Sequence, residues 1–271
     1  MLSTGALRAH LLAARLAGPV ATTREQSLRS YRLFAARDPR ATLGLTPERA
    51  WCESDLLRLM ADRCGVSGDP AHVSGGDVID PERTLSSLDA FAARLGSAAG
   101  RRAPVLFGTG HPDRLIGFYA GLADALSAAG CLVLTPAKGR CIDITTRFGV
   151  RTHSLDYVRR VALVRESEAS HAGSETGAHS HSPLPVRVVL DSVAEAGGPL
   201  PELVVGDHGW VCGAGQLGIE AVGLADTDDP ALFVGEAEGR VSVVVPVDDG
   251  VRSDYYRPLT RYVLNRACLS Q

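Results

Sequence analysis

Apolar side chains recur at helical spacing in the first part of the chain. Leu7, Leu11 and Leu12 begin one such stripe, and residues 56–60 carry another, which ends before a glycine. This spacing places the apolar positions on one side of a helix, and the glycine is typical of a helix end. No strand pattern is evident here, so residues 1–100 are predicted to be helical.

The pattern changes in the second part of the chain, where apolar residues follow one another directly. Residues 105–107 form an apolar run, a Gly-rich turn follows, residues 115–126 carry a helical stripe, and residues 132–134 form a second run. This order predicts a strand, a crossover helix and a second, parallel strand with a right-handed connection. The turn at residues 108–113 then lies at the carboxyl edge of the sheet, where open α/β sheets bind ligands.

Further runs rich in β-branched residues each end in or beside glycine or aspartate. They span residues 186–191, 202–207, 231–235 and 241–247. Since β-branched residues favour strands, we predict that each run is a strand of the same sheet. The whole pattern predicts an α/β fold over residues 103–271: an open, mostly parallel twisted sheet of roughly five to seven strands with flanking helices. The helical region 1–100 precedes it as a lid or as an oligomer surface, and both interpretations stay open.

Residues 165–185 interrupt this series with a segment rich in Ser, Gly, Ala and His. The segment has no hydrophobic periodicity, so we predict a disordered surface insertion. His171, His179 and His181 lie within it, and histidine is a common metal ligand. A flexible segment supplies no preformed geometry for a metal, so we favour histidines that hold no ligand.

Composition and charge narrow the function classes. The chain has 271 residues, 45% of them hydrophobic, which is enough for a full core. A net charge of −3 with mixed signs gives no basic surface for nucleic acid, and six cysteines without C-x-x-C spacing predict free thiols. Charged residues interrupt residues 1–25, which therefore predict neither a signal peptide nor a membrane span. We expect a cytoplasmic protein without nucleic-acid or membrane partners, and a homo-oligomer stays open.

The stretch GDHGWVCGAGQLGIE, residues 206–220, contains the G-x-G-x-x-G spacing of a dinucleotide site at Gly213, Gly215 and Gly218. Such a site needs a strand directly before its first glycine. Here the predicted strand ends at Gly206, seven residues before Gly213. We therefore expect no NAD, and we predict that these glycines permit tight turns and close backbone packing.

Asp207 and His208 follow a predicted strand and are flanked by Gly206 and Gly209. This places both residues at the carboxyl edge of the sheet, where glycines let the backbone approach a ligand closely. An aspartate there is suited to bind a metal or to accept a proton, and a histidine, with an ordinary pKa of about 6.5, to transfer one. We predict catalytic roles for both; the alternative is that Asp207 caps a turn and His208 is structural.

The turn FGTGHP supplies a second part of the candidate site. Gly108, Thr109 and Gly110 follow an apolar run and precede a helix, so N–H groups and the helix dipole are predicted to bind an anionic substrate group there. His111 adds a donor and is a third candidate catalytic residue. No G-K-[ST] follows, so the turn is not a Walker A loop, and a turn without a ligand is the alternative.

Charged residues at the other predicted strand ends complete the candidate site. Lys138 and Arg140 follow the second strand and are predicted to bind a phosphate from the opposite side. Carboxylates gather after the later runs: Asp191, Asp226, Asp228, Asp229, Glu236, Glu238, Asp248 and Asp249. Because carboxylate oxygens bind hard cations, we expect a divalent metal such as Mg²⁺, with Asp191 and Asp207 as its candidate ligands.

Three separated blocks carry a resemblance to a known family. They are GVSGDPAHVSGGDVIDPERTL (65–85), VLFGTGHPDRLIGFYAGLADALSAAGCLVLTP (105–136) and VGDHGWVCGAGQLGIEAVGLADTDDPALFVGEAEGRVSVVVPVDDG (205–250). In these blocks the chain resembles a family of actinobacterial phosphatases. The stretch GDHGWVCGAG is also faintly similar to the G-D-G-G-N-E-x-G-M-G stretch of D-glutamate cyclase-like proteins. This chain lacks the Gly-Asn-Glu part, so the second similarity implies a shared fold more than a shared reaction.

The resemblance and the candidate residues together predict a phosphatase that hydrolyses a small phosphate monoester with the help of a metal. Asp207 would hold the metal or accept the proton of a water molecule, and His208 or His111 would protonate the leaving group. A covalent aspartyl-phosphate at Asp191 is disfavoured because the D-x-D-x-[TV] pattern is missing. Two alternatives stay open: a lyase or cyclase acting on a small carboxylate, and a non-catalytic metabolite-binding protein.

Overall fold

The centre of the protein is a mostly parallel β-sheet. A computed structural model describes residues 3–146, 149–166 and 177–269. Within that part the sheet has eight strands, and its order along the main path is β10 (Val243–Pro246), β9 (Ala221–Ala225), β8 (Leu203–Asp207), β3 (Pro104–Gly108), β7 (Val161–Glu166), β6 (Gly149–Val158) and β5 (Cys141–Thr146). The short β4 (Leu132–Val133) also pairs with β3. Strands from β10 to β7 are parallel, whereas β5, β6 and β7 form an antiparallel edge.

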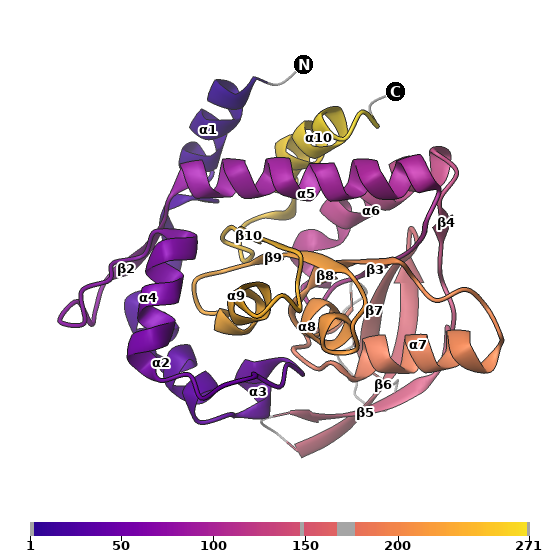
Figure 1. Cartoon of the computed structure of the whole chain (residues 1–271), viewed down its shortest axis with the longest axis horizontal. Coiled ribbons are helices and arrows are strands. Elements are labelled where there is room, and N and C mark those ends of the chain that lie inside the picture. Colours follow the sequence, from indigo (N-terminus) through magenta and orange to yellow (C-terminus); the bar gives the residue numbers. More distant parts are fainter. Residues whose placement is uncertain (1–2, 147–148, 167–176, 270–271) are drawn as a thin grey trace.

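Helices cover both faces of this sheet (Figure 1), which confirms the predicted α/β fold. One face carries α1 (Thr4–Ala13), α5 (Pro81–Arg101), α6 (Pro112–Ala128), the 3-10 turn η1 (Ser253–Tyr256) and α10 (Arg257–Arg266). The other face carries α2 (Arg24–Ala35), α3 (Pro39–Thr42), α4 (Glu53–Cys64), α7 (Leu184–Glu195), α8 (His208–Gln216) and α9 (Pro230–Ala237). Side chains alternate along each strand, so Val105 and Phe107 belong to the first core and Leu106 to the second.

The first hundred residues contain two strands, so the prediction of a purely helical region is wrong. β1 (Gly18–Thr23) pairs antiparallel with β2 (Gly76–Ile79) to form a separate two-stranded sheet. Both strands are short and contain glycine, and β1 also contains a proline, so neither has the apolar alternation of a strand pattern. The sheet matters for function because the end of β1 lies beside a cavity at the main sheet.

Two of the predicted strands are helices. Residues 186–191 lie in α7 and residues 231–235 lie in α9. In α7 the buried positions Val186, Val189 and Leu190 recur at helical spacing, which the β-branched composition of the run concealed. Conversely, β9 was not predicted, because its sequence AVGLA contains only small and apolar residues.

Glycines let the parallel strands and their helices pack closely. A Cβ on Gly206 would lie 2.2 Å from the carbonyl oxygen of Gly108, and one on Gly223 would lie 2.4 Å from that of Gly206. Gly213 and Gly215 lie inside α8, where a Cβ would lie 2.7 Å from Val186 and 2.4 Å from the Arg240 carbonyl, respectively. Close packing is thus the role of the glycines in the GAG stretch, as predicted.

The segment 165–185 is only partly described. Residues 167–176, including His171, lie outside the described residues. Ala178 forms an antiparallel bridge with Val164 of β7, and the N–H of Ser180 donates to the Gly110 carbonyl at 3.0 Å. Residues 177–185 therefore lie against the carboxyl edge of the sheet.

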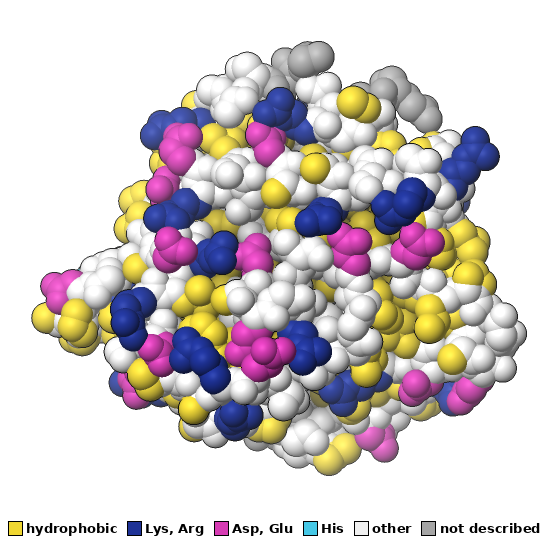
Figure 2. All heavy atoms as spheres, viewed as in Figure 1, with side chains coloured by type: hydrophobic (Ala, Val, Ile, Leu, Met, Phe, Trp, Pro, Cys, Tyr) yellow, Lys and Arg dark blue, Asp and Glu magenta, His cyan; other side chains and the backbone are white. Residues whose placement is uncertain are grey.

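The surface carries charges of both signs. Basic and acidic side chains are interspersed on the face shown in Figure 2. Ion pairs between exposed side chains include Arg8 with Glu82 and Arg101 with Glu202. Among the described residues, no helix has the length and apolar character needed to cross a membrane.

Candidate active site

A cavity of about 340 Å³ lies at the carboxyl edge of the parallel strands. Its walls come from the residues that follow β3, β8, β9 and β10, from the segment after residue 176, and from the end of β1. The charged and histidine side chains that line it are His111, His179, His181, His208, Asp226, Asp228, Asp229, Asp248 and Asp249. Ligands bind in open α/β sheets at this edge, so its position is that of a functional site.

His208 lies at the sharp turn from β8 into α8. Its φ is 43°, in the left-handed region that a residue with a side chain seldom adopts. Glycines on both sides of the turn leave the room that it needs. A Cβ on Gly209 would lie 2.3 Å from the Ser182 carbonyl oxygen, and a Cβ on Gly206 would lie 2.2 Å from the Gly108 carbonyl oxygen. A non-glycine residue held in this conformation costs about 1–3 kcal/mol, and such strain clusters at functional sites.

Asp207 is fully buried beneath His208. Its Oδ2 accepts the hydroxyl hydrogen of Thr109 at 2.6 Å, and its Oδ1 accepts the N–H of Gly110 at 2.6 Å. Burial raises the pKa of Asp207, while the nearby His208 and these two donors lower it. The donors of the FGTGHP turn that were predicted to bind a substrate anion therefore bind a carboxylate of the protein itself.

His208 is surrounded by carboxylates. Its Nε2 lies 3.1 Å from Asp229 Oδ2 and 3.6 Å from Asp249 Oδ2, and its Nδ1 lies 3.8 Å from Asp207 Oδ1. Burial lowers the pKa of His208, but Asp229, Asp207 and Asp249 outweigh that effect and raise it to about 10. Burial raises the pKa of Asp229 and the positive His208 lowers it, with a net pKa below the ordinary value. In the absence of a metal, His208 is a buried cation paired with Asp229.

Three more histidines surround His208. The ring centre of His111 lies 4.1 Å from that of His179 and 4.4 Å from that of His208, and the His181 ring lies 4.2 Å from His208. Burial, followed by the charge of His208, lowers the pKa of His111 strongly, of His179 to about 3 and of His181 to about 4. These three imidazoles are therefore neutral at pH 7 and carry a free nitrogen lone pair.

Several nitrogen and oxygen atoms in the cavity that could bind a metal are buried without a hydrogen-bond partner among the described residues. They are His111 Nδ1, His208 Nδ1 and Asp249 Oδ2. Asp249 Oδ2 is 3.3 Å from His111 Nδ1. Two sets of side chains bring their ligand atoms within 4.8 Å of one another: His111 with His179 and His208, and His208 with Asp229 and Asp249. Buried polar atoms without partners are rare, and imidazole and carboxylate groups fit a divalent metal.

Two other aspartates fix the walls of the cavity. Asp226 accepts the hydroxyl hydrogen of Thr22 and the N–H of Thr227, and Asp248 accepts the N–H groups of Ala21 and Gly250. These bonds tie the end of β1 to the loops that follow β9 and β10. No sequence pattern indicated this contact between the N-terminal region and the sheet. Nearby, burial and then the charge of Asp229 raise the pKa of Asp228 to about 7.

The structure brings some of the predicted site residues together and leaves others apart. His111 and His208 line the cavity, with Asp207, Thr109 and Gly110 directly behind them. The remaining predicted residues do not line it: Lys138 pairs with Asp156 at 3.2 Å, Arg140 pairs with Glu195 at 3.3 Å, Asp191 is exposed on α7, and Gly108 packs under Trp210. His179 and His181, which the sequence analysis assigned to a mobile segment without a ligand, lie inside the cavity.

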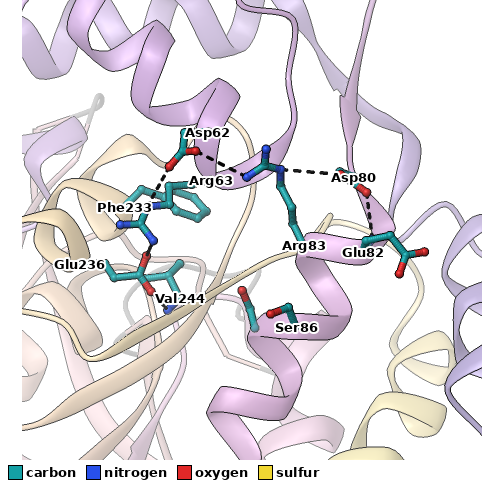
Figure 3. A pocket seen from close by; sticks show the side chains of 10 residues that line it. Asp62, Arg63, Asp80, Glu82, Arg83, Ser86, Phe233, Glu236 and Val244 are labelled. Carbon is teal, nitrogen blue, oxygen red and sulfur yellow. Dashed lines mark hydrogen bonds and ion pairs between the residues drawn. The ribbon is translucent and has the colours of Figure 1, made fainter.

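A second cavity, of about 360 Å³, lies between α4, α5, α9 and β10 (Figure 3). Its charged side chains neutralise one another. Arg63 pairs with Glu236 at 3.3 Å, and Arg83 lies 3.7 Å from Asp80 and 3.8 Å from Asp62. We therefore place the candidate active site in the histidine and aspartate cavity.

Comparison with known proteins gives two findings. The sequence model of a protein family described as "Phosphatase" matches residues 2–271. A protein named Phosphatase SCO2771, from Streptomyces coelicolor, is 44% identical over 269 residues, which cover 98% of this chain and 97% of that protein. The similarity thus includes every segment that lines the histidine and aspartate cavity.

Proposed function

Because the chain belongs to the Phosphatase family, as its three sequence blocks predicted, we propose that the histidine and aspartate cavity hydrolyses a small phosphate monoester with a divalent metal bound there. One observation carries this assignment. Neutral imidazoles and buried carboxylates converge on one point at the carboxyl edge of the sheet, and several of their donor atoms have no partner among the described residues. This arrangement fits a metal ion together with a phosphoryl group.

The donor set indicates the class of metal. His208, Asp229 and Asp249 form the more buried group, and His111 and His179 extend it. Imidazole nitrogen suits Zn²⁺, Co²⁺, Ni²⁺ and Mn²⁺ better than Mg²⁺, so the Mg²⁺ expected from sequence is not the first choice. When bound, such an ion polarises a phosphoryl oxygen and acidifies a water molecule. Because His208 must lose its proton to become a ligand, metal affinity rises with pH.

Two further residues complete the proposed site: His181 transfers a proton and Asp207 positions its neighbours. His181 Nδ1 lies 3.3 Å from the Arg40 carbonyl oxygen, which can only accept, so Nδ1 carries the hydrogen and Nε2 a lone pair. His181 is thus suited to take the proton of the attacking water and return it to the leaving oxygen. For Asp207 we propose that it positions His208 and the turn of His111 from behind, in place of the metal-binding or proton-accepting role predicted from sequence.

Phosphate release tests this proposal. Purified protein is treated with chelator and assayed with p-nitrophenyl phosphate and a panel of small phosphate monoesters, with and without Mg²⁺, Mn²⁺, Co²⁺ or Zn²⁺. We expect turnover that chelator abolishes, that a nitrogen-preferring metal restores, and that Asp249→Asn lowers by about a hundredfold or more. Asp62→Asn is the matched control, since Asp62 lines the other cavity. Turnover that resists the chelator, or an Asp249→Asn variant as active as the control, would contradict the proposal.

A further inference from the structure

A third cavity, of about 490 Å³, adjoins the candidate active site along the chain. It lies between the first turns of α6, η1 and α10, and the turn that joins β6 to β7. Pro112 lines this cavity while the preceding His111 lines the active site, and Ser253 lines it three residues after Gly250. Two chain segments thus pass directly from one cavity to the other.

Arginines dominate the charge of this cavity. Arg257 and Arg261 are exposed and one helical turn apart on α10, and neither has an ion-pair partner among the described residues. Like charges one turn apart on a helix repel each other, so this pair does not stabilise α10 by itself. A guanidinium group presents a planar fork of donors that matches a carboxylate or a phosphate.

The third arginine, Arg159, is held by a strained turn. Arg159 and the adjacent Arg160 have φ values of 46° and 67° and occupy the two positions between β6 and β7. Such two-residue turns favour asparagine and glycine, because both residues must be left-handed. Both guanidinium groups bind Asp124, which fixes Arg159 at the cavity. The turn retains two arginines against the backbone preference, which points to a role for their charge.

The acidic residues of this cavity do not neutralise the arginines of α10. Asp113 pairs with Arg114 at 3.1 Å and Asp254 pairs with Arg252 at 2.9 Å. Neither forms an ion pair with Arg257 or Arg261, and the same holds for the other carboxylates among the described residues. The hydroxyl of Thr260 adds a neutral polar group. The cavity therefore combines free positive charge with hydrogen-bonding groups.

We propose that this arginine cavity binds a second anionic group of the substrate, a carboxylate or a further phosphate, while the ester phosphate occupies the active site. The inference rests on the proposed function and extends it, since it names the substrate class: phosphate monoesters whose remaining part carries a negative charge. Arg257 and Arg261 contact that charge, and Arg159 lines the same cavity. The two groups of the substrate are bound from neighbouring segments, so both sites contribute to specificity.

Non-hydrolysable probes test this subsite without requiring turnover. Phosphonoalkanoic acids with chains of two to six carbons are compared, by calorimetry, with alkylphosphonates of the same length, which lack the carboxylate. In the wild-type protein we expect the best carboxylated probe to bind about tenfold more tightly than its uncharged counterpart. The Arg257→Gln/Arg261→Gln variant should lose this preference and keep its affinity for alkylphosphonates. The Arg29→Gln/Arg32→Gln variant removes two exposed arginines of α2 and should keep the preference.

Phosphate release from p-nitrophenyl phosphate, measured on the same preparations, separates this inference from the proposed function. Its leaving group carries no carboxylate, so the Arg257→Gln/Arg261→Gln variant should lose much less activity toward it than toward an ester whose remaining part carries a carboxylate. If no ester is hydrolysed but the carboxylate preference exists and depends on Arg257 and Arg261, the proposed function fails and the anion site stands. If wild-type protein shows no preference at any length, or if the double variant retains it, the anion site is refuted.

Discussion

Replacing Thr109 by valine measures how firmly the buried Asp207 is held. The Thr109 hydroxyl donates to Asp207 Oδ2 at 2.6 Å and accepts the N–H of His111 at 3.0 Å. Valine keeps the shape of the side chain and removes both bonds. A hydrogen bond to a charged group contributes about 1.5–3 kcal/mol and a neutral one about 0.5–1.5 kcal/mol, so the free energy of unfolding should fall by roughly 2–4 kcal/mol.

Thr84→Val is the matched control. Thr84 is also buried, but its hydroxyl donates to the neutral Pro246 carbonyl at 2.8 Å and not to a carboxylate. Its loss should cost about 1 kcal/mol. Urea unfolding gives the loss of free energy for both variants, provided that the dependence of the free energy of unfolding on urea concentration is unchanged. Thr109→Ser keeps the hydroxyl, so its free energy of unfolding should remain near that of the wild type.

Activity gives a second measurement on the same variants. The Thr109 turn carries His111, and a displacement of about 1 Å in a catalytic group can cost a hundredfold in rate. Thr109→Val should therefore lower phosphate release by about tenfold or more, whereas Thr84→Val should leave it unchanged. If Thr109→Val destabilises the protein no more than Thr84→Val and has the same activity, Asp207 is not held in the way described.

Other variants and conditions test separate parts of the structure. Adding Zn²⁺ or Mn²⁺ to chelator-treated protein should raise its Tm, and an equal rise in Asp249→Asn would exclude this residue as a ligand. Burial and the charge of His208 lower the pKa of His181 to about 4, so this imidazole should be neutral in the metal-free folded state where it is protonated in the unfolded chain, below about pH 6.5. Relative to a His181→Gln variant, the wild-type protein should lose free energy of unfolding as the pH drops from about 6.5 towards 4, by up to about 1.4 kcal/mol per pH unit, and a difference between the two proteins that does not change with pH in denaturant titrations would contradict this. Gly206→Ala, whose Cβ would lie 2.2 Å from a backbone oxygen, should destabilise by about 1–3 kcal/mol or prevent folding. Gly117 lies in α6, and a Cβ added there would have no heavy atom of another element within 4 Å, so Gly117→Ala should raise the free energy of unfolding by about 0.5–1 kcal/mol. Thermal unfolding should therefore give a lower Tm for Gly206→Ala and a higher Tm for Gly117→Ala than for the wild type.

The sequence predicted the parts of the fold in which local pattern and tertiary structure agree. The strand, helix and strand over residues 104–133 have clear periodicities, and the carboxyl edge follows from their parallel order. The prediction was wrong over residues 186–191 and 231–235, because a short apolar run fits a buried helix as well as a buried strand. As a result, Asp191 was expected at the edge of the sheet, whereas it lies on the exposed side of α7.

The residues that line the candidate site were predictable where they follow a strand of the sheet. His111 and His208 were found in this way, and Asp229 and Asp249 were recognised as carboxylates near strand ends. His179 was assigned to a mobile segment because composition says nothing about long-range contacts. Its position depends on the bridge from the neighbouring residue 178 to β7, a contact between segments that no periodicity records.

The charges of the cavity support the proposal that a cation binds there. Asp207, Asp229 and Asp249 are buried around His208, whose single positive charge cannot balance three carboxylates. Burial and then the charge of Asp229 raise the pKa of Asp249. A phosphate ester brings further negative charge and would be repelled by carboxylates alone. His208, Asp229 and Asp249 would hold a divalent ion, which would use the same carboxylates as ligands and would offer the phosphoryl oxygens a positive partner. The proposed metal thus reconciles the acidic residues with the proposed phosphate substrate, and the dependence of phosphate release on that metal tests the assignment.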